Sequence, residues 1–172
     1  MKHRQIDSPV GPLTLVVNDH GVLSGLYFAD QTNRPSDAAL GELDEAVAAD
    51  AVHQLGEYFA GQRSTFDLQI SLHGTEFQVE VWEALRNVPF GQSVSYSALA
   101  ALLGHPHASR AVGAAVGRNP ITIIVPCHRV VGSRGALTGY SGGIDRKRWL
   151  LDHEAAVARE KWSGSGEADQ AS

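Results

Sequence analysis

The chain has 172 residues, of which 43% are hydrophobic, and a formal net charge of −5. This composition excludes a wholly disordered chain, and the length supplies one domain or two small ones. Its single cysteine, Cys127, excludes a disulfide framework and a cysteine-rich zinc site, and the absence of a long apolar run or secretory signal predicts a cytoplasmic protein.

The first half of the chain predicts strands followed by a helix. Alternating or β-branched residues between turn signals predict strands over residues 4–7, 13–17, 22–28 and 66–70. The polar stretch 29–41 is expected to be a loop. Apolar residues at helical spacing predict a helix over 43–59 that ends at Gly61.

The second half is expected to be mostly helical. Thr75 and Gln78 fit a capping box that opens a helix running to about Asn87. Ser93 or Ser95 is expected to cap a second helix, which ends at Gly104. A third helix is expected over about 109–117, and two short helices with a tight link between them are typical of a helix-turn-helix.

The rest of the chain carries a buried run, a loop and a last helix. The β-branched run 121–125 predicts a buried strand, and the glycines of 132–143 predict a loop. A last helix is expected from Asp145 through Glu154. The segment 158–172 is expected to be a disordered tail.

Basic residues gather in one segment of this acidic chain. Between Asn87 and Leu151 there are seven basic residues and a single acid, Asp145, so this segment carries +6 and the remainder −11. Such a block can be a nucleic-acid-binding surface or an ordinary solvated face.

The only cysteine lies in the run Pro126-Cys127-His128-Arg129-Val130. A thiolate is the reactive form of cysteine, and positive charge nearby favours it. Neighbours on an extended chain point in opposite directions, however, and a lone cysteine is more often buried and inert. Upstream, Asn119-Pro120 breaks a helix, and an asparagine side chain there can tie two turns together.

Together these segments resemble the O6-alkylguanine-DNA alkyltransferases, also called methylated-DNA–protein-cysteine methyltransferases. The resemblance covers about residues 4–156. It rests on Asn119-Pro120, Pro126–Val130, Gly139-Tyr140-Ser141-Gly142-Gly143, Leu150-Leu151 with His153-Glu154, and Tyr96 with Arg110. It implies an α/β, ribonuclease H-like N-terminal domain over 1–72 and a mostly α C-terminal domain with a helix-turn-helix over 73–157. Alkyltransferase-like members of this superfamily lack the cysteine, so Cys127 indicates the active branch.

The resemblance implies DNA repair by direct reversal without a cofactor or a metal. An alkyl group would move from O6 of guanine, and from O4 of thymine, to Cys127 in one irreversible turnover. A Cys–water–His–Glu relay is implied on Cys127, His128 and Glu154. Asn119 belongs to the same implied catalytic set, and Tyr96 is the implied proton donor to N3 of the base.

The implied partner is double-stranded DNA that contains O6-alkylguanine. The second helix of the helix-turn-helix would enter the minor groove, and Arg110 would fill the place of the flipped base. The implied DNA-binding residues are Arg110, Ala111, Gly113, Ala114 and Arg118, and the implied base pocket is formed by Val130, Tyr140, Ser141 and Gly142. A monomer that can assemble cooperatively on DNA is expected, with no membrane partner.

Other interpretations remain open at this point. A non-catalytic module that binds alkylated bases is the main alternative, and such a module would not need Cys127. Gly139–Gly143 also satisfies the G-x-S-x-G pattern of hydrolases, but the adjacent Asp152 and His153 poorly fit the other triad members. His105 and His107 are expected to lie on a surface turn rather than bind a metal. A cysteine peptidase would need a separate His–Asn arrangement that the sequence does not show.

Overall fold

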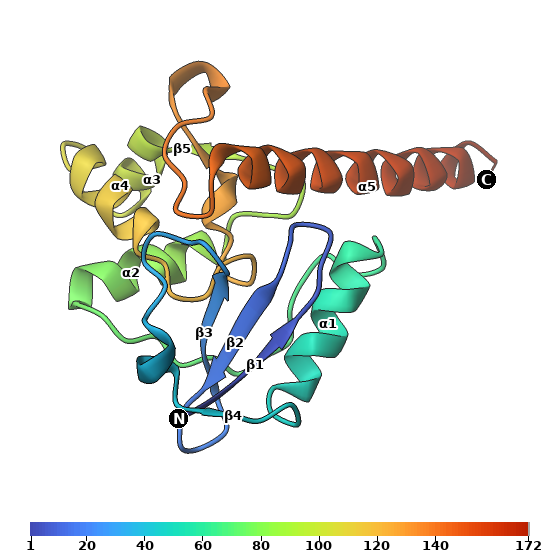
Figure 1. Cartoon of the computed structure of the whole chain (residues 1–172). Helices are drawn as coiled ribbons and strands as arrows, with labels where there is room; N and C mark the ends of the chain where they lie inside the picture. Colours follow the sequence, from blue (N-terminus) through green and yellow to red (C-terminus); the bar gives the residue numbers. More distant parts are fainter. Residues whose placement is uncertain (172) are drawn as a thin grey trace.

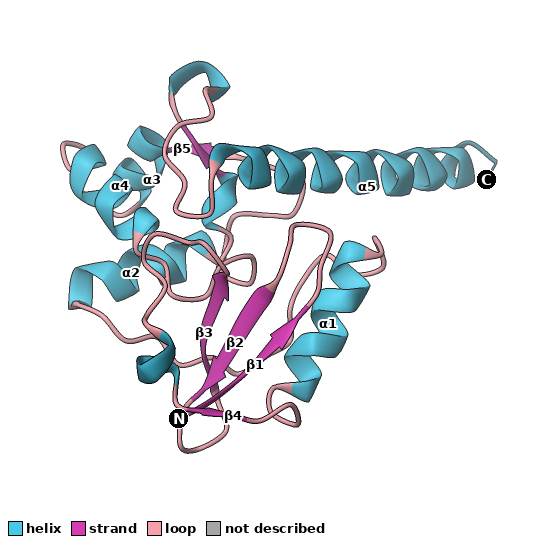
Figure 2. Cartoon of the chain, in the orientation of Figure 1, coloured by secondary structure: helices cyan, strands magenta, loops and turns pink. Residues whose placement is uncertain are grey.

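The structure is a computed structural model that describes the backbone of residues 1–171 and the side chains of residues 1–161. A small sheet and one helix form the N-terminal part, and a group of helices forms the C-terminal part (Figures 1 and 2). Among the described residues, no helix is both long and apolar enough to cross a membrane.

The N-terminal sheet has the strand order β3-β2-β1-β4. Strands β1 (Lys2–Ile6), β2 (Leu13–Val17) and β3 (Leu23–Phe28) are antiparallel neighbours, and β4 (Glu42–Leu43) pairs in parallel with β1. Every residue of β2 is buried, because this central strand is covered on both faces.

Different elements cover the two faces of the sheet. Helix α1 (Ala49–Phe59) lies beside the sheet (Figure 1), and its buried residues Leu55 and Tyr58 join the same apolar cluster as Leu13 and Leu15 of β2. On the other face, the short 3₁₀ helix Asp37–Leu40 brings Leu40 against Val16 and Tyr27.

The C-terminal part contains the remaining helices. These are α2 (Glu76–Leu85), α3 (Tyr96–Leu102), α4 (Ser109–Gly117) and α5 (Ile144–Ala171). The short strands β5 (Val94–Ser95) and β6 (Val130–Val131) pair in parallel, and 3₁₀ turns lie at Cys127–Arg129 and Ser133–Gly135. The predicted capping box at Thr75 is confirmed, and Ser95 rather than Ser93 caps α3.

The two parts share one hydrophobic core. Residues of β2, β3 and α1 form a single buried cluster with residues of α2, α4 and the segment 121–130. Backbone hydrogen bonds join the parts directly, because Leu26 N donates to Pro120 O at 2.8 Å and Thr122 N donates to Leu26 O at 3.1 Å. The C-terminal part is therefore built onto the edge of β3.

The N-terminal part departs from the prediction at two places. Residue 43 belongs to β4 and not to a helix, because its backbone pairs with His3; α1 starts six residues later, after Ala48 at a φ of 57°. Residues 66–70 form no named strand. The backbone at Asp67 exchanges two hydrogen bonds with the Gln54 side chain, and only Ile70 bridges to β3.

The C-terminal part also departs from the prediction at two places. Residues 121–125 are buried as expected but form a tight turn and not a strand, in which Val125 N donates to Ile121 O at 2.9 Å. Helix α5 continues to Ala171, where the sequence predicts a disordered tail from residue 158. The chain has no proline after Pro126 that would remove a backbone donor from this helix. Residue 172 lies outside the described residues.

Candidate active site

Cys127 begins the short 3₁₀ turn after the 121–125 segment, and its side chain is 6% exposed. Its Sγ lies 3.9 Å from Thr122 Oγ1, which in turn contacts the Tyr140 hydroxyl at 3.0 Å. Burial raises the pKa of the Cys127 thiol above its usual value, although hydrogen bonds from Asn119 and the charge of Lys147 act in the opposite direction. The resting sulfur is therefore a protonated thiol.

His128, next in the chain, is completely buried and turned toward α5. Its Nε2 lies 2.7 Å from Glu154 Oε2, and its Nδ1 is buried without a hydrogen-bond partner among the described residues. Because this stretch is a 3₁₀ turn and not an extended strand, Cys127 and His128 are not forced to point in opposite directions as neighbours on a strand would be.

Glu154 accepts hydrogen bonds from three parts of the chain besides its own helix. Arg129 donates to both carboxylate oxygens, from Nε at 2.8 Å and from Nη2 at 2.9 Å. The Tyr58 hydroxyl of α1 donates to Oε2 at 2.6 Å, and the Gly91 amide donates to Oε1 at 3.3 Å. Burial by itself raises the pKa of Glu154, but the hydrogen bonds from His128 and Arg129, together with the charge of Arg129, outweigh burial and hold this pKa far below its usual value.

The charge of Glu154 settles which histidine nitrogen carries the proton. Because an ionised carboxylate only accepts hydrogen bonds, Nε2 of His128 must be the donor. Burial lowers the pKa of His128 below its usual value, and the neighbouring Arg129 acts in the same direction. At neutral pH the imidazole is thus neutral, with its basic lone pair on the buried Nδ1.

Asn119 holds the turn that precedes the cysteine. Its Nδ2 donates to Val125 O at 2.7 Å, and its Oδ1 accepts from Ile121 N at 3.0 Å. Between these points Ile123 has a φ of 70°, a conformation that a β-branched residue rarely adopts. The asparagine therefore ties two turns together, as its position before Pro120 predicts, and fixes the backbone that leads to Cys127.

The loop before α5 forms the outer wall of the site. Tyr140 packs its ring edge-on against Phe28, with the centroids 6.1 Å apart, and the Ser141 hydroxyl donates to Gly117 O. A Cβ on Gly142 would lie 2.4 Å from the Phe28 ring, so only glycine fits there. Val130 is fully buried in β6, so its side chain belongs to the core.

Tyr96 and the outer face of α4 flank this wall. The Tyr96 hydroxyl is 3.5 Å from the carbonyls of Thr138 and Gly139, and burial raises its pKa. On α4, Val112, Ala115 and Val116 face the core. The predicted DNA contacts Arg110, Ala111, Gly113 and Ala114 are exposed or half-exposed on this helix, as are Ser109 and Gly117, and the fifth predicted contact, Arg118, is exposed directly after its end.

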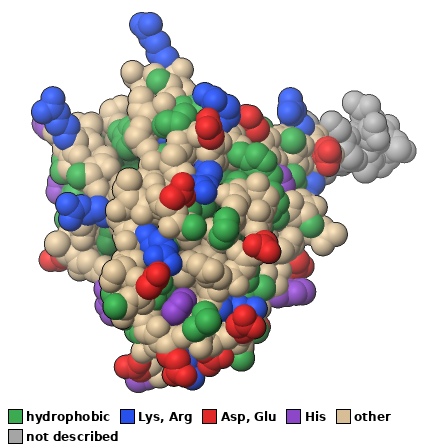
Figure 3. Space-filling view, in the orientation of Figure 1, with side chains coloured by type: hydrophobic (Ala, Val, Ile, Leu, Met, Phe, Trp, Pro, Cys, Tyr) green, Lys and Arg blue, Asp and Glu red, His purple; other side chains and the backbone are tan. Residues whose placement is uncertain are grey.

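Only part of the basic block faces solvent. Lys147 is fully buried and donates to Thr138 O at 3.0 Å, Arg129 is buried on Glu154, and Arg146 pairs with Asp30. Arg110, Arg118, Arg134 and Arg148 remain exposed. In Figure 3, basic side chains stand out at the upper and left edges, whereas acidic ones gather at the lower end near the N-terminus.

The alternative sites are not assembled. The Ser141 hydroxyl bonds to Gly117 O, while His153 bonds to Tyr58 O at 2.8 Å and stacks on Trp149, so the hydrolase-like residues have separate partners. His105 and His107 are exposed on the turn between α3 and α4.

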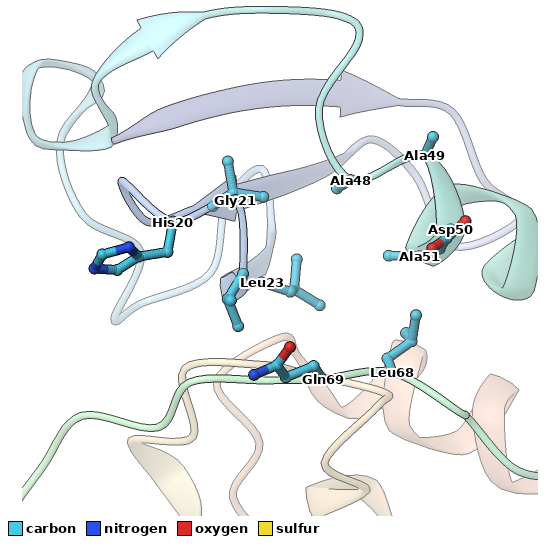
Figure 4. A pocket seen from close by; sticks show the side chains of 11 residues that line it. His20, Gly21, Leu23, Ala48, Ala49, Asp50, Ala51, Leu68 and Gln69 are labelled. Carbon is cyan, nitrogen blue, oxygen red and sulfur yellow. The ribbon is translucent and has the colours of Figure 1, made fainter.

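A hollow of about 340 Å³ lies in the N-terminal part, between the hairpin turn at His20 and the start of α1 (Figure 4). Its lining shares no residue with the Cys127 site.

Sequence reasoning missed three side chains that complete the site. Tyr58 reaches Glu154 from α1, Lys147 is buried behind the wall, and Arg146 contacts that wall from α5. In the sequence, Lys147 and Arg146 are members of a basic run, and nothing else indicates that they contact the site. No local sequence signal indicates that Tyr58 does.

Comparisons with known proteins cover nearly the whole chain. Residues 1–72 match the family described as 6-O-methylguanine DNA methyltransferase, ribonuclease-like domain, and residues 76–156 match its DNA binding domain. The methylated-DNA–protein-cysteine methyltransferase of Mycolicibacterium paratuberculosis is 51% identical over 151 residues, covering 88% of this chain and 90% of that protein. The counterpart from Salmonella typhimurium is 45% identical, covering 87% and 93%. The crystal structure of Mycobacterium tuberculosis OGT in complex with DNA superposes with a TM-score of 0.85 at 48% identity, covering 91% of this chain and 94% of that one.

Proposed function

The chain belongs to the 6-O-methylguanine DNA methyltransferase family and transfers alkyl groups from DNA to itself, and we propose that Cys127 is the cysteine that accepts them. The observation that carries this proposal is the buried set formed by Cys127, His128 and Glu154. A non-catalytic binding module would need neither the thiol nor a neutral histidine held by a carboxylate.

The relay starts from a protonated thiol and a neutral imidazole. Cys127 gives its proton, through a water molecule, to Nδ1 of His128, the ring nitrogen that has no other partner. The resulting imidazolium is stabilised by the Glu154 carboxylate at 2.7 Å, and Arg129 keeps that carboxylate ionised. The relay therefore produces a thiolate within a site that by itself favours the thiol.

The sulfur then displaces the base from its alkyl group. A carbon–sulfur bond forms, the bond between O6 and the alkyl carbon breaks, and its electron pair passes to the guanine. Tyr96 supplies a proton to ring N3 of this leaving group, and its raised pKa keeps it protonated at neutral pH. The proton that the thiol loses is then on His128, and the proton that the guanine gains has come from Tyr96. Exchange with water returns one proton from the imidazolium to the tyrosinate, so the net result is one proton moved from the thiol to the guanine. The same displacement applies to O4-alkylthymine, to which we extend the proposal.

The thioether product ends the reaction. It has no leaving group comparable with the guanine, so each molecule acts once. Because the proposed chemistry depends on a free thiol, we place the protein in the cytoplasm, where thiols stay reduced. All proposed relay residues come from one chain, which fits a protein that acts as a monomer.

The proposed DNA surface is the outer face of α4. Its small residues Ala111, Gly113 and Ala114 allow close approach to a groove, which we take to be the minor groove. Arg110, at the start of this helix, would fill the space that the flipped base leaves. We propose a domain boundary at 72/73, supported by the family matches over 1–72 and 76–156.

Mass spectrometry tests the proposal directly. After incubation with a duplex that contains one O6-methylguanine, the peptide that contains Cys127 should gain the mass of one methylene group. The unmodified duplex should leave this mass unchanged. Cys127→Ser should bind the same duplex with similar affinity, because phosphate contacts come from elsewhere, and should show no mass gain. Binding by the natural protein without any mass change at Cys127 would instead indicate a non-catalytic binder.

A further inference from the structure

The pocket over Cys127 is closed in this structure. The free space next to the sulfur amounts to about 10 Å³ and is bounded by residues of the turn, of α4 and of the loop before α5. That volume holds about one water molecule, whereas pockets for small organic ligands measure roughly 300–1,000 Å³. A base and its alkyl group therefore enter only if one wall moves.

The wall that can move is the segment 139–142. The opposite walls, Thr122 and Cys127, lie in the fully buried stretch 121–131. The segment 139–142, in contrast, connects a protruding loop to α5, and Gly139 and Gly143 at its ends have positive φ angles of 41° and 91°. Glycine changes φ and ψ at low cost, so these two residues are suited to be hinges.

This wall is fastened to the N-terminal part of the molecule. The Arg146 guanidinium donates through Nη1 to Gly142 O at 3.1 Å and to Asp30, and through Nε to Val10 O at 2.8 Å. The same guanidinium lies 4.8 Å from the centre of the Phe28 ring, which packs against Gly142.

A further backbone hydrogen bond runs from Thr32 N to Ser141 O at 3.3 Å. In Figure 1 the segment entering α5 comes down next to the end of β3 and the loop that follows it.

We propose that Arg146 determines how large an alkyl group the site accepts, because it clamps the 139–142 wall to Asp30 and Val10 of the N-terminal part. This inference rests on the proposed reaction at Cys127. The C-terminal part also holds the wall, because the Ser141 hydroxyl donates to Gly117 O, and Lys147 donates to Thr138 O directly before the hinge at Gly139. Loosening Arg146 therefore leaves the wall in place but lets it yield further. A methyl group needs little extra room, and a benzyl group needs much more.

The test is a ratio of two single-turnover rates. O6-benzylguanine and O6-methylguanine are placed at the same position of one duplex, and their rates of transfer to Cys127 are compared. Arg146→Ala should raise the benzyl-to-methyl ratio by about three- to tenfold, the range expected for charge-assisted contacts that are partly exposed. Asp30→Asn should raise it less, since it weakens only one contact, and Arg146→Lys should restore part of the preference for methyl.

Arg148→Ala is the matched control. Arg148 lies two residues further along α5, is exposed, and has only a 4.0 Å ion pair with Asp145. It should leave the ratio unchanged. Equal loss of both rates in Arg146→Ala, or a lower ratio, would overturn the clamp, as would the same rise in Arg148→Ala. Failure of the unmutated protein to alkylate Cys127 would overturn the proposed function itself, so the two failures are distinguishable.

Discussion

Glu154 shows how a single buried carboxylate organises this site. It is fully buried, yet donors from His128, Arg129, Tyr58 and Gly91 satisfy both oxygens. Removing one partner of a buried ion pair leaves an uncompensated charge, which costs far more than the pair contributes in net stability. The carboxylate therefore supports both the proposed relay and the packing around it.

Glu154→Gln should damage both properties. Arg129 would keep its buried charge without an anion, so the free energy of unfolding should fall by about 3–5 kcal/mol. The rate of alkyl transfer should fall by roughly a hundredfold or more, because His128 loses the anion that stabilises its protonated form. Urea unfolding and single-turnover reaction with free O6-benzylguanine measure the two effects. Glu160→Gln, on an exposed position of the same helix, is the control and should change neither quantity.

The lowered pKa of His128 predicts how stability depends on pH. In the folded protein the buried imidazole stays neutral below its ordinary pKa of 6.5, while the unfolded chain takes up a proton there. The unfolded state then binds more protons, so stability is full above about pH 6.5 and falls as the pH is lowered, by at most about 1.4 kcal/mol per pH unit for this group. Glu154, whose pKa is also lowered, adds a second loss below about pH 4.5.

Urea unfolding between pH 7.5 and 5 measures this slope. His128→Asn should flatten it, whereas His20→Asn, at an exposed position, should retain it. An unchanged slope in His128→Asn would mean that other groups dominate the acid response.

At the level of elements, α3 and α4 divide the proposed work on the duplex. Helix α4 presents its exposed small residues and Arg110 outward, and α3 begins with Tyr96 at the edge of the pocket. Gly113 lies against the Tyr96 ring, and a Cβ added at Gly113 would be 3.6 Å from the nearest atom of that ring. The two helices thus keep the proposed base-flipping residue and the proposed proton donor in a fixed relation.

Arg110→Ala and Tyr96→Phe should separate these two roles. Extrusion of a base costs a few kcal/mol in a duplex and nothing for the free base, so Arg110→Ala should slow repair of duplex DNA much more than reaction with free O6-benzylguanine. Tyr96→Phe should slow both reactions, because the leaving guanine needs a proton in each. Single-turnover rates of alkyl transfer from the duplex and from the free base measure both effects. Arg86→Ala, which removes an arginine outside the basic segment, is the control and should change neither rate. Equal losses on both substrates for Arg110→Ala would mean that it supports the pocket.

Local signals predicted the elements that depend on local interactions. The bounds of β2, the capping box at Thr75 and the extent of α4 all follow from periodicity and capping residues. The failures occurred where a distant group determines the backbone. The backbone of Asp67 forms hydrogen bonds with the Gln54 side chain and not with a neighbouring strand. The Asn119 side-chain amide donates to Val125 O and so stabilises residues 121–125 as a turn.

The site divides in the same way. The motif around Cys127 and the end of α5 pointed to Cys127, His128 and Glu154, and the structure joins His128 to Glu154. The partners supplied by the N-terminal part, Tyr58 and Asp30, are about a hundred residues away in sequence from the groups they contact, as the separations of 96 and 116 positions show. No periodicity or short motif carries such information.

The whole molecule consists of two parts that match two family domains, 1–72 and 76–156, but both parts contribute to one hydrophobic core. The N-terminal part is a structural component of the proposed site, because the backbone of its Leu26 bonds to residues 120–122 and its Tyr58 donates a hydrogen bond to Glu154. A substitution in α1 should therefore affect the surroundings of Glu154.

Tyr58→Phe tests this connection. It removes only a hydroxyl, so the free energy of unfolding should fall by about 1–3 kcal/mol, the cost of a lost hydrogen bond to a charged group. Tyr27→Phe is the matched control, because Tyr27 is also buried in the N-terminal part but its hydroxyl makes no hydrogen bond among the described residues. Thermal and urea unfolding of the two variants should differ clearly, and equal effects would show that the bond to Glu154 contributes nothing.

The position of Glu154 in the chain has a consequence for newly made protein. Translation proceeds from the N-terminus, so Cys127 and His128 leave the ribosome before the carboxylate that His128 requires. Until α5 docks, the imidazole has no anionic partner and the thiol has no organised base. A protein that is consumed in a single reaction thus completes its proposed relay only after Glu154 has been synthesised and α5 has docked against His128.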